Sequence, residues 1–168
     1  MARKTQILVI GHNDNGCTPE HEKTAYDTGA AIARSGAVLI SGGLGGVMRA
    51  SCRGAREAGG LTVGIIPQDA HSEANEFCDV VLPSGMGLTR DFLNALAADG
   101  IIIIGGGSGT LSEVCAAYMY RRPMVAVRGT GGVADRYGGT FVDYRENIMI
   151  GQADSPDEAV RSILEAIT

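Results

Sequence analysis

The fold is decided by one stretch of the chain, Ile101-Ile102-Ile103-Ile104-Gly105-Gly106-Gly107-Ser108-Gly109-Thr110-Leu111-Ser112-Glu113. Four consecutive β-branched apolar residues without polar alternation are typical of a strand that is buried on both faces of a parallel sheet. The strand leads directly into glycines, which adopt backbone angles closed to other residues and let a ligand approach the main chain. A segment with helical character begins at Thr110. Unpaired N–H groups and the positive end of a helix dipole then point at one spot, which suits a phosphate or a similar anion.

A second stretch repeats this arrangement earlier in the chain. Residues 37–41 are predicted to form a strand, followed by the glycine turn 42–46 and a helix over 47–58. In parallel sheets, ligands bind at the carboxyl ends of the strands, near the point where the strand order reverses. Both turns follow strands, so we expect them to face one crevice and to provide two anion-binding turns. Close packing of helix on strand, without a ligand, is the alternative interpretation of each turn.

The remaining elements alternate in the same way. Further strands are predicted at 6–11, 61–66, 79–83, 124–127 and 147–150, and further helices at 18–35, 88–98, 111–121 and 155–167. Segment 68–77 has no clear period and is predicted to be a loop, and the glycine-rich segment 129–139 is predicted to be a mobile loop. Strands that alternate with helices throughout predict a single domain over residues 1–168, an α/β three-layer sandwich with a mostly parallel sheet.

Composition narrows the classes of function. The chain has 168 residues, a formal net charge of −5 and a pI of about 5.1. Its lysines and arginines are scattered, so we expect no nucleic acid partner. No apolar stretch reaches the roughly 18 residues of a membrane span, so we expect no membrane partner and a cytoplasmic location.

No metal site is predicted. Four cysteines lack both C-x-x-C spacing and a histidine-rich partner segment, namely Cys17, Cys52, Cys78 and Cys115. Buried free thiols in a reducing compartment are a simpler interpretation than zinc ligands or a disulfide framework. Cys115 is predicted to lie in the core because it falls on the apolar face of helix 111–121. His12 and His21 flank the first loop and are expected to be solvated or to cap a helix.

Two charged side chains are candidates for chemistry at the glycine turn. Glu113 closes the segment 110–113, which matches the capping box S/T-x-x-E, so a helix cap is one interpretation. A carboxylate one turn into a phosphate-binding helix also faces the pocket, where it could orient a ribose hydroxyl, polarise water or offset a developing cation. Arg90 falls in the first turn of its helix, where the macrodipole disfavours a cation. This placement indicates a partner carboxylate or a bound anion, with a solvated surface arginine as the alternative.

Four segments of the chain resemble a known superfamily. They are Ser-Gly-Gly-Leu-Gly-Gly-Val-Met at 41–48, Gly-Ile-Ile-Pro at 64–67, Gly-Met-Gly-Leu-Thr-Arg-Asp at 85–91, and the glycine turn with its helix start at 105–113. Together they are similar to the Rossmann-like superfamily that joins the molybdenum cofactor carrier proteins with the "lonely guy" phosphoribohydrolases, which are often called lysine decarboxylases. The resemblance covers most of the chain and implies a Rossmann-like fold.

The resemblance also implies roles for individual residues. In the hydrolases the last segment opens Pro-Gly-Gly and carries a catalytic Glu paired with an upstream Arg. Here Gly105 replaces that proline, while Arg90 and Glu113 occupy the matching places. The hydrolases usually have an Arg-Lys pair where this chain has Arg90 and Asp91, which is closer to the carriers. No lysine suited to pyridoxal phosphate stands in the pocket region, so a decarboxylase activity is unsupported.

The leading expectation is therefore binding of a phosphorylated, nucleotide-like small molecule, in the manner of the molybdenum cofactor carriers. The alternative is hydrolysis of the N-glycosidic bond of a nucleoside 5′-monophosphate, in which Arg90 holds the substrate and Glu113 stabilises the cationic sugar or activates water. The sequence shows no aromatic residue placed to clamp a base, which favours the carrier. No cofactor is required for either function, and the bound molecule is expected to be molybdenum cofactor, a nucleotide or phosphate.

The residues expected to bind the ligand or its phosphate follow from the two turns and the resemblance. They are Gly11, Gly42, Gly43, Gly45, Gly46, Val47, Met48, Pro67, Arg90, Gly105, Gly106, Gly107, Ser108, Gly109, Thr110 and Glu113. Arg90 and Glu113 are the catalytic candidates if the protein is an enzyme. By resemblance we also expect a homodimer or homotetramer. Helices 88–98 and 111–121 carry more apolar surface than one sheet face needs, at Phe92, Leu96, Tyr118, Met119 and Tyr120.

Overall fold

The structure, a computed structural model, describes residues 3–168. Its strands form a single sheet and are β1 (Gln6–Gly11), β2 (Val38–Ser41), β3 (Thr62–Ile66), β4 (Val80–Pro83), β5 (Gly100–Ile104), β6 (Met124–Val127) and β7 (Gly151–Ala153). The strand order is β4-β3-β2-β1-β5-β6-β7, and every pairing of neighbours in the described chain is parallel. The order reverses between β1 and β5, so the topological switch point lies there. The predicted α/β fold with a parallel sheet is confirmed.

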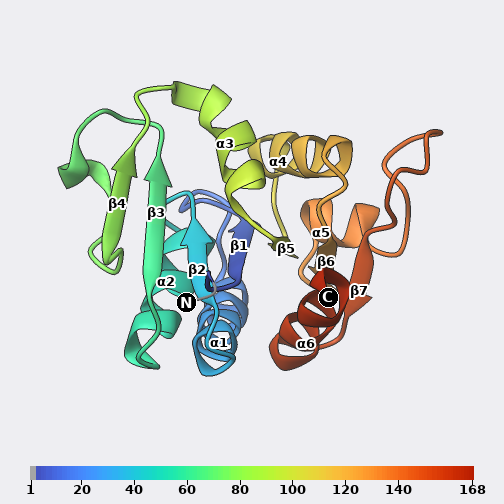
Figure 1. The fold of residues 1–168 in the computed structure, drawn as a ribbon, viewed down its shortest axis with the longest axis horizontal. Helices are drawn as coiled ribbons and strands as arrows, with labels where there is room; N and C mark the ends of the chain where they lie inside the picture. The colour runs from blue at the N-terminus through green and yellow to red at the C-terminus, as the bar shows by residue number, and fades with distance from the viewer. Residues whose placement is uncertain (1–2) are drawn as a thin grey trace.

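Helices cover both faces of the sheet and complete a three-layer sandwich. They are α1 (Pro19–Arg34), α2 (Val47–Glu57), α3 (Arg90–Ala97), α4 (Ser108–Met119), α5 (Gly132–Tyr137) and α6 (Pro156–Ile167). Helices α1, α2 and α6 cover one face, and α3, α4 and α5 cover the other (Figure 1). Two short 3-10 turns, His71–Glu73 and Gly87–Thr89, complete the regular structure. Within residues 3–168 no helix is both long and apolar enough to cross a membrane.

The isoleucines of β5 explain why this strand lies in the middle of the molecule. Ile102 and Ile104 belong to the core under α1, α2 and α6, whereas Ile101 and Ile103 belong to the core under α3, α4 and α5. All four are fully buried. Successive side chains of a strand point to opposite faces, so an unbroken apolar run supplies both cores at once.

Two predictions for the carboxyl-terminal third of the chain were wrong. The segment 129–139 contains α5 instead of a mobile loop, because the Asp135 carboxylate accepts the N–H groups of Gly129 and Gly131 and closes the turn before the helix. The last strand is β7, at Gly151–Ala153, and not 147–150. Its position is set by pairing with β6, which a local pattern does not report.

The exposed sides of α3 and α4 also differ from the prediction. Cys115 is exposed instead of buried in the core. Phe92 and Leu96 do lie on the outside of α3, where Phe92 is 51% exposed and Leu93 and Leu96 are each 40% exposed, but Tyr118 of α4, which was expected to belong to the same surface, is 1% exposed. The side of α3 that turns inward carries Arg90, Asp91, Asn94 and Ala95. Polar groups thus occupy the buried face of α3, which is unusual unless they serve a site.

Candidate functional site

A cavity opens at the switch point, where β1 and β5 end side by side. Its volume is about 410 Å³, which lies within the range of small-molecule sites. The end of β1, the turn after β2, the residue after β3, the start of α3 and the start of α4 all contribute to its wall. The two glycine turns therefore reach one crevice, as the sequence predicted.

The turn after β5 is open towards this cavity. Gly107 is the residue before α4, and no side chain caps the helix start. Among the described residues, the N–H groups of residues 107–110 have no hydrogen-bond acceptor in the protein. A Cβ at Gly107 or Gly109 would meet nothing within 4 Å, so packing of the chain itself does not require glycine at either position. Exposed N–H groups at a helix start form a site for an anion.

The turn after β2 is partly closed by the protein itself. Asp14, from the loop after β1, accepts the N–H of Gly46 at 2.8 Å, and the carbonyl of His12 accepts the N–H of Val47 at 2.9 Å. A Cβ at Gly45 would lie 2.0 Å from the Asp14 carboxylate. The carboxylate of Asp14 thus occupies part of the turn where the sequence placed a ligand anion, whereas the N–H groups of Leu44, Gly45 and Met48 have no acceptor in the described chain.

The predicted binding residues divide into two groups. Ten of them line the cavity, namely Gly11, Gly42, Met48, Pro67, Arg90, Gly107, Ser108, Gly109, Thr110 and Glu113. Six lie outside the lining, namely Gly43, Gly45, Gly46, Val47, Gly105 and Gly106. In this second group the N–H of Gly43 donates to Ser41 Oγ, and that of Gly105 donates to Thr130 Oγ1. These six shape the turns from behind the cavity surface.

The cavity also contains residues that the sequence reasoning missed. Leu44 and Leu88 join Met48 and Pro67 as an apolar part of the wall, and Asp91 lies beside Arg90. His12 and Asn13 line the cavity from the loop that follows β1. These two residues could have been predicted from the sequence, because a loop at the carboxyl end of a central strand is expected to border the ligand site. Asp91 carried no such signal, because its inward orientation depends on how α3 packs, and Leu88 lies at the rim of the cavity in the 3-10 turn before α3, where it is 86% exposed.

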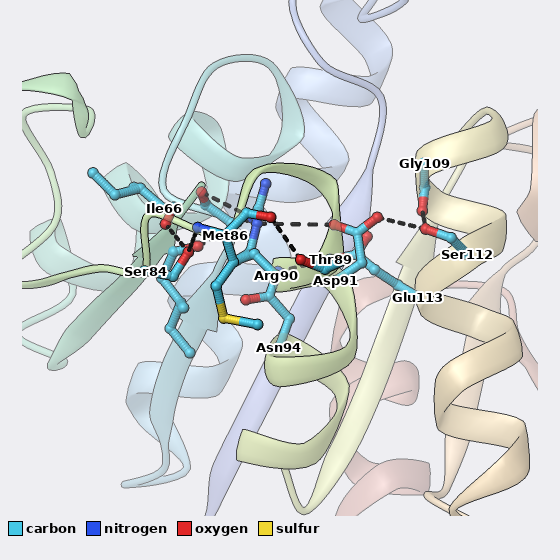
Figure 2. A network of polar contacts seen from close by, with 12 residues as sticks. Ile66, Ser84, Met86, Thr89, Arg90, Asp91, Asn94, Gly109, Ser112 and Glu113 are labelled. Atoms are coloured by element: carbon cyan, nitrogen blue, oxygen red, sulfur yellow. Dashed lines mark hydrogen bonds and ion pairs between the residues drawn. The ribbon is translucent and has the colours of Figure 1, made fainter. Parts of the chain in front are cut away.

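Arg90 is buried and tied to the sheet. Its Nη1 donates to the carbonyls of Gly42 and Ile65, each at 3.1 Å, so the side chain links α3 to the carboxyl ends of β2 and β3. Its Nε lies 3.8 Å from Asp91 Oδ1 and has no hydrogen-bond partner in the described chain (Figure 2). A buried cation with an unpartnered N–H beside the cavity is available to a ligand oxygen.

Glu113 lies on the side of α4 that faces α3 and is 8% exposed. Its Oε1 accepts a hydrogen bond from the Asn94 amide at 2.9 Å. Burial raises the pKa of Glu113 to about 8, with the nearby Asp91 carboxylate adding to the rise and the Asn94 hydrogen bond and Arg90 opposing it. Glu113 is therefore mostly uncharged at pH 7.

The capping-box interpretation of residues 110–113 is wrong. Helix α4 begins at Ser108, so Thr110 already lies inside it, and its hydroxyl donates to the carbonyl of Gly11 at 3.1 Å. Glu113 contacts α3 instead of returning to the helix start. A sequence pattern for a cap was present, but the structure uses both side chains to join α4 to its neighbours.

The two histidines of the first loop have different roles. His21 completes the capping box of α1 with Thr18, and its Nε2 lies 2.7 Å from the carbonyl of Thr130. The capping role expected from the sequence is confirmed for His21. His12 lies 4.8 Å from the His21 ring and lines the cavity, and its pKa is lowered by burial first and by His21 second. His12 is therefore uncharged at neutral pH.

Known proteins share both this fold and part of this sequence. An uncharacterized protein of Archaeoglobus fulgidus is 44% identical over 112 residues, which cover 67% of this chain and 72% of that protein. The molybdenum cofactor binding protein of Rippkaea orientalis is 33% identical over 100% of both chains, with a TM-score of 0.88. The molybdenum cofactor carrier protein of Chlamydomonas reinhardtii is 30% identical over 97% of this chain and 98% of its own, with a TM-score of 0.83.

These likenesses extend over the sheet, the switch point and both glycine turns, and so over the elements that build the cavity. The resemblance inferred from the four sequence segments is thereby confirmed. Residues 4–160, which include all of the cavity wall, match one described family. The chain belongs to the SLOG cluster4 family.

Proposed function

We propose that this protein binds a phosphorylated, nucleotide-like small molecule, with the phosphate at residues 107–110 and the ring system against the apolar wall. The observation that carries this proposal is the open start of α4, where N–H groups without acceptors adjoin two glycines that packing does not require. Arg90 adds a buried cation near the same place. Molybdenum cofactor is a phosphorylated pterin, so the similarity to the carrier of Chlamydomonas reinhardtii supports the same class of ligand here.

The test compares ligands that differ only in their phosphate. Isothermal titration calorimetry with AMP and with adenosine measures what the phosphate contributes, and molybdenum cofactor released from a purified molybdoenzyme tests the pterin. We expect AMP and the cofactor to bind and adenosine to bind at least about tenfold more weakly, since a charge-assisted hydrogen bond contributes on the order of 1.5–3 kcal/mol. Equal affinity for AMP and adenosine would show that the phosphate contributes nothing to binding and would refute a phosphate site at residues 107–110.

A second candidate function is hydrolysis of the N-glycosidic bond of a nucleoside 5′-monophosphate. It is supported by one observation, that Arg90 and Glu113 line the same cavity. Stabilising a cationic sugar requires an ionised carboxylate, whereas burial keeps Glu113 mostly uncharged at pH 7. Apart from the His12 ring, the described lining contains no aromatic side chain to hold a leaving base. The geometry therefore favours binding without cleavage.

Chromatography of AMP incubated with the protein separates the two candidates. We expect little or no free adenine at pH 7 while AMP still binds. Arg90→Ala should weaken binding, because the cavity loses its buried cation. Glu113→Gln should alter binding modestly. Robust release of adenine that disappears in Glu113→Gln would establish the hydrolase in place of the carrier.

A further inference from the structure

The centre of the cavity holds three ionisable groups that are all nearly buried. Arg90 and Asp91 come from the first turn of α3, and Glu113 comes from α4. Their exposed fractions are 8%, 7% and 8%. If both carboxyl groups were ionised, one guanidinium would face two carboxylates, and the group would carry a net charge of −1 beside the site proposed for a phosphate. Such a charge would repel the ligand.

The polar contacts distinguish the two carboxyl groups. Asp91 has one hydrogen-bond donor and one ion-pair partner, since the Ser112 hydroxyl donates to Oδ2 at 2.5 Å and Arg90 Nε lies 3.8 Å from Oδ1 (Figure 2). Glu113 has one neutral donor, the amide of Asn94. No cation of residues 3–168 forms an ion pair with Glu113. The contacts support a negative charge on Asp91 much better than on Glu113, so a proton shared by the pair resides on Glu113.

We propose that Asp91 is a positioning residue that keeps Glu113 protonated near neutral pH, so that the charge at the centre of the cavity, and with it the affinity for a phosphorylated ligand, depends on the proton of Glu113. The contacts with Arg90 and Ser112 fix the Asp91 carboxylate between α3 and α4, next to Glu113. Ionisation of Glu113 releases its proton to solvent and leaves the three groups with a net charge of −1. Binding of the phosphate is then coupled to the retention of that proton. The part of this inference that concerns ligand binding rests on the proposed function, whereas the protonation of Glu113 does not.

Every charged or titratable group that faces Glu113 can be named. Arg90 and Asp91 face it from α3, and His12 lines the same cavity from the loop after β1. The pKa of His12 is lowered, so its ring stays neutral above pH 7. A phosphate monoester is already a dianion above pH 7, because its second pKa is about 6. Between pH 7 and pH 9.5 the ionisation of Glu113 is therefore the event expected to change affinity, consistent with its pKa of about 8.

The first arm needs no ligand. Infrared difference spectroscopy of the whole chain labelled with carboxyl-¹³C glutamate should show the carbonyl band of a protonated carboxylic acid at pH 7. The band should disappear as the pH rises towards 9.5, and it should be absent in Glu113→Gln. In Asp91→Asn it should disappear roughly one pH unit lower, because a neighbouring like charge has been removed. The matched control is Asp157→Asn, an exposed partner of Arg34 on α6, which should leave the midpoint where it is.

The second arm measures AMP affinity over the same pH range by calorimetry. The wild-type affinity should fall by up to about tenfold per pH unit above the midpoint, and Glu113→Gln should flatten this profile. At pH 9 Asp91→Asn should bind AMP about tenfold more tightly than the wild type, because the cavity holds one negative charge fewer. A merely structural role for Asp91 predicts weaker binding at every pH.

Three outcomes would overturn the inference. The first is a wild-type spectrum without the protonated carboxyl band at pH 7, which requires no variant that could fail to fold. The second is an unchanged midpoint in folded Asp91→Asn. The third is AMP affinity that is independent of pH in the wild type, which would sink the inference while leaving the proposed function intact. Absence of AMP binding together with the expected infrared titration would instead refute the proposed function and leave the charge assignment standing.

Discussion

The turn at 42–46 and the turn at 105–109 each join a buried strand to a helix, yet only at the first does the described chain itself supply acceptors to the N–H groups of the turn's end and the first helical residue. At the first, the Asp14 carboxylate and the His12 carbonyl accept the N–H groups of Gly46 and Val47. At the second, no acceptor in the described chain faces residues 107–110. The same local sequence device thus serves two purposes, since one turn binds its own chain and the other is available to a ligand.

Glycine stands at Gly46 and at Gly107 for different physical reasons. Gly46 has a φ of +60°, and a Cβ there would lie 2.4 Å from the His12 carbonyl. Gly107 has a φ of −112°, and a Cβ there would meet nothing within 4 Å. Glycine at 46 is required by the fold, whereas glycine at 107 is not required by packing and leaves space for a molecule that approaches from outside. The predictions below use this difference.

The largest effect is expected on the outer surfaces of α2, which follows the first turn, and of α4 with its neighbour α3, on the side of the second turn. Helix α2 exposes the charged residues Arg49, Arg53 and Arg56, whereas α3 and α4 expose Phe92, Leu96, Met119 and Tyr120, each at least 40% exposed. We therefore expect the protein to be at least a dimer through α3 and α4, because several large apolar side chains on two packed helices are rarely left in water. Light scattering should show a mass at least twice that of the 17.4 kDa chain.

Variants on the two sides provide the control for the oligomer. Replacing Phe92 and Leu96 by Asp should reduce the mass to that of one chain, and Arg53→Asp on α2 should leave it unchanged. A monomeric wild-type protein at micromolar concentration would refute the prediction.

The next effect concerns stability at the closed turn. Gly46→Ala should reduce the free energy of unfolding by about 3 kcal/mol, because the new Cβ meets backbone atoms and the positive φ is unfavourable for alanine. Gly107→Ala should change it by less than about 0.5 kcal/mol, since its Cβ points into open space. Urea unfolding followed by circular dichroism measures both. Equal losses in the two variants would abolish the distinction between the turns.

A smaller effect is expected on binding at the open turn. Gly107→Asp places a like charge and a side chain at the phosphate site, and should weaken AMP binding roughly 30-fold, or about 2 kcal/mol. Ala58→Asp is the matched control, because Ala58 is exposed at the end of α2, outside the cavity wall, and has an ordinary φ of −87°. Calorimetry that finds unchanged affinity in Gly107→Asp would withdraw the site assignment.

A change of about 1 kcal/mol is expected when Asp14 is removed. Asp14→Ala takes away the acceptor of the Gly46 N–H and should destabilise the protein by about 1 kcal/mol, as loss of a helix cap does. The loss should grow smaller when phosphate is added at high concentration, because an external anion can then occupy the opened turn. A stability equal to that of the wild type would show that Asp14 does not serve as the internal anion.

The smallest effect separates stability from function at one residue. Gly109→Ala lies inside the first turn of α4 and should stabilise the protein by roughly 0.5 kcal/mol, because alanine favours helix more than glycine does. The same variant should weaken AMP binding, since a methyl group then stands where the ligand approaches. A thermal melt measures the change in stability, and a calorimetric titration on the same preparation measures the change in AMP affinity; the two changes should have opposite directions. Weakened binding with lowered stability would indicate a distorted helix instead.

The sequence by itself determined the order of the elements and the place of the site. The unbroken isoleucine run of β5 required burial on both faces, and this placed a glycine turn at the carboxyl end of a central strand. Patterns of this kind depend only on neighbours along the chain, which is why β5, its turn and α4 were predicted close to their observed positions. The short α5 escaped prediction because Asp135 closes its turn through two N–H contacts that no periodicity reveals.

Only the tertiary structure decided which N–H groups of each turn find an acceptor within the chain and which charges meet in the cavity. Asp14 reaches Gly46 across 32 positions of sequence, and Asp91 reaches Ser112 across 21. Hydrogen bonds and charge interactions act through space, so residues that are distant in sequence change a local motif without leaving a trace in it. For this reason two turns with similar sequences have different partners, and a glutamate that matches a helix cap instead holds a proton at the centre of the cavity.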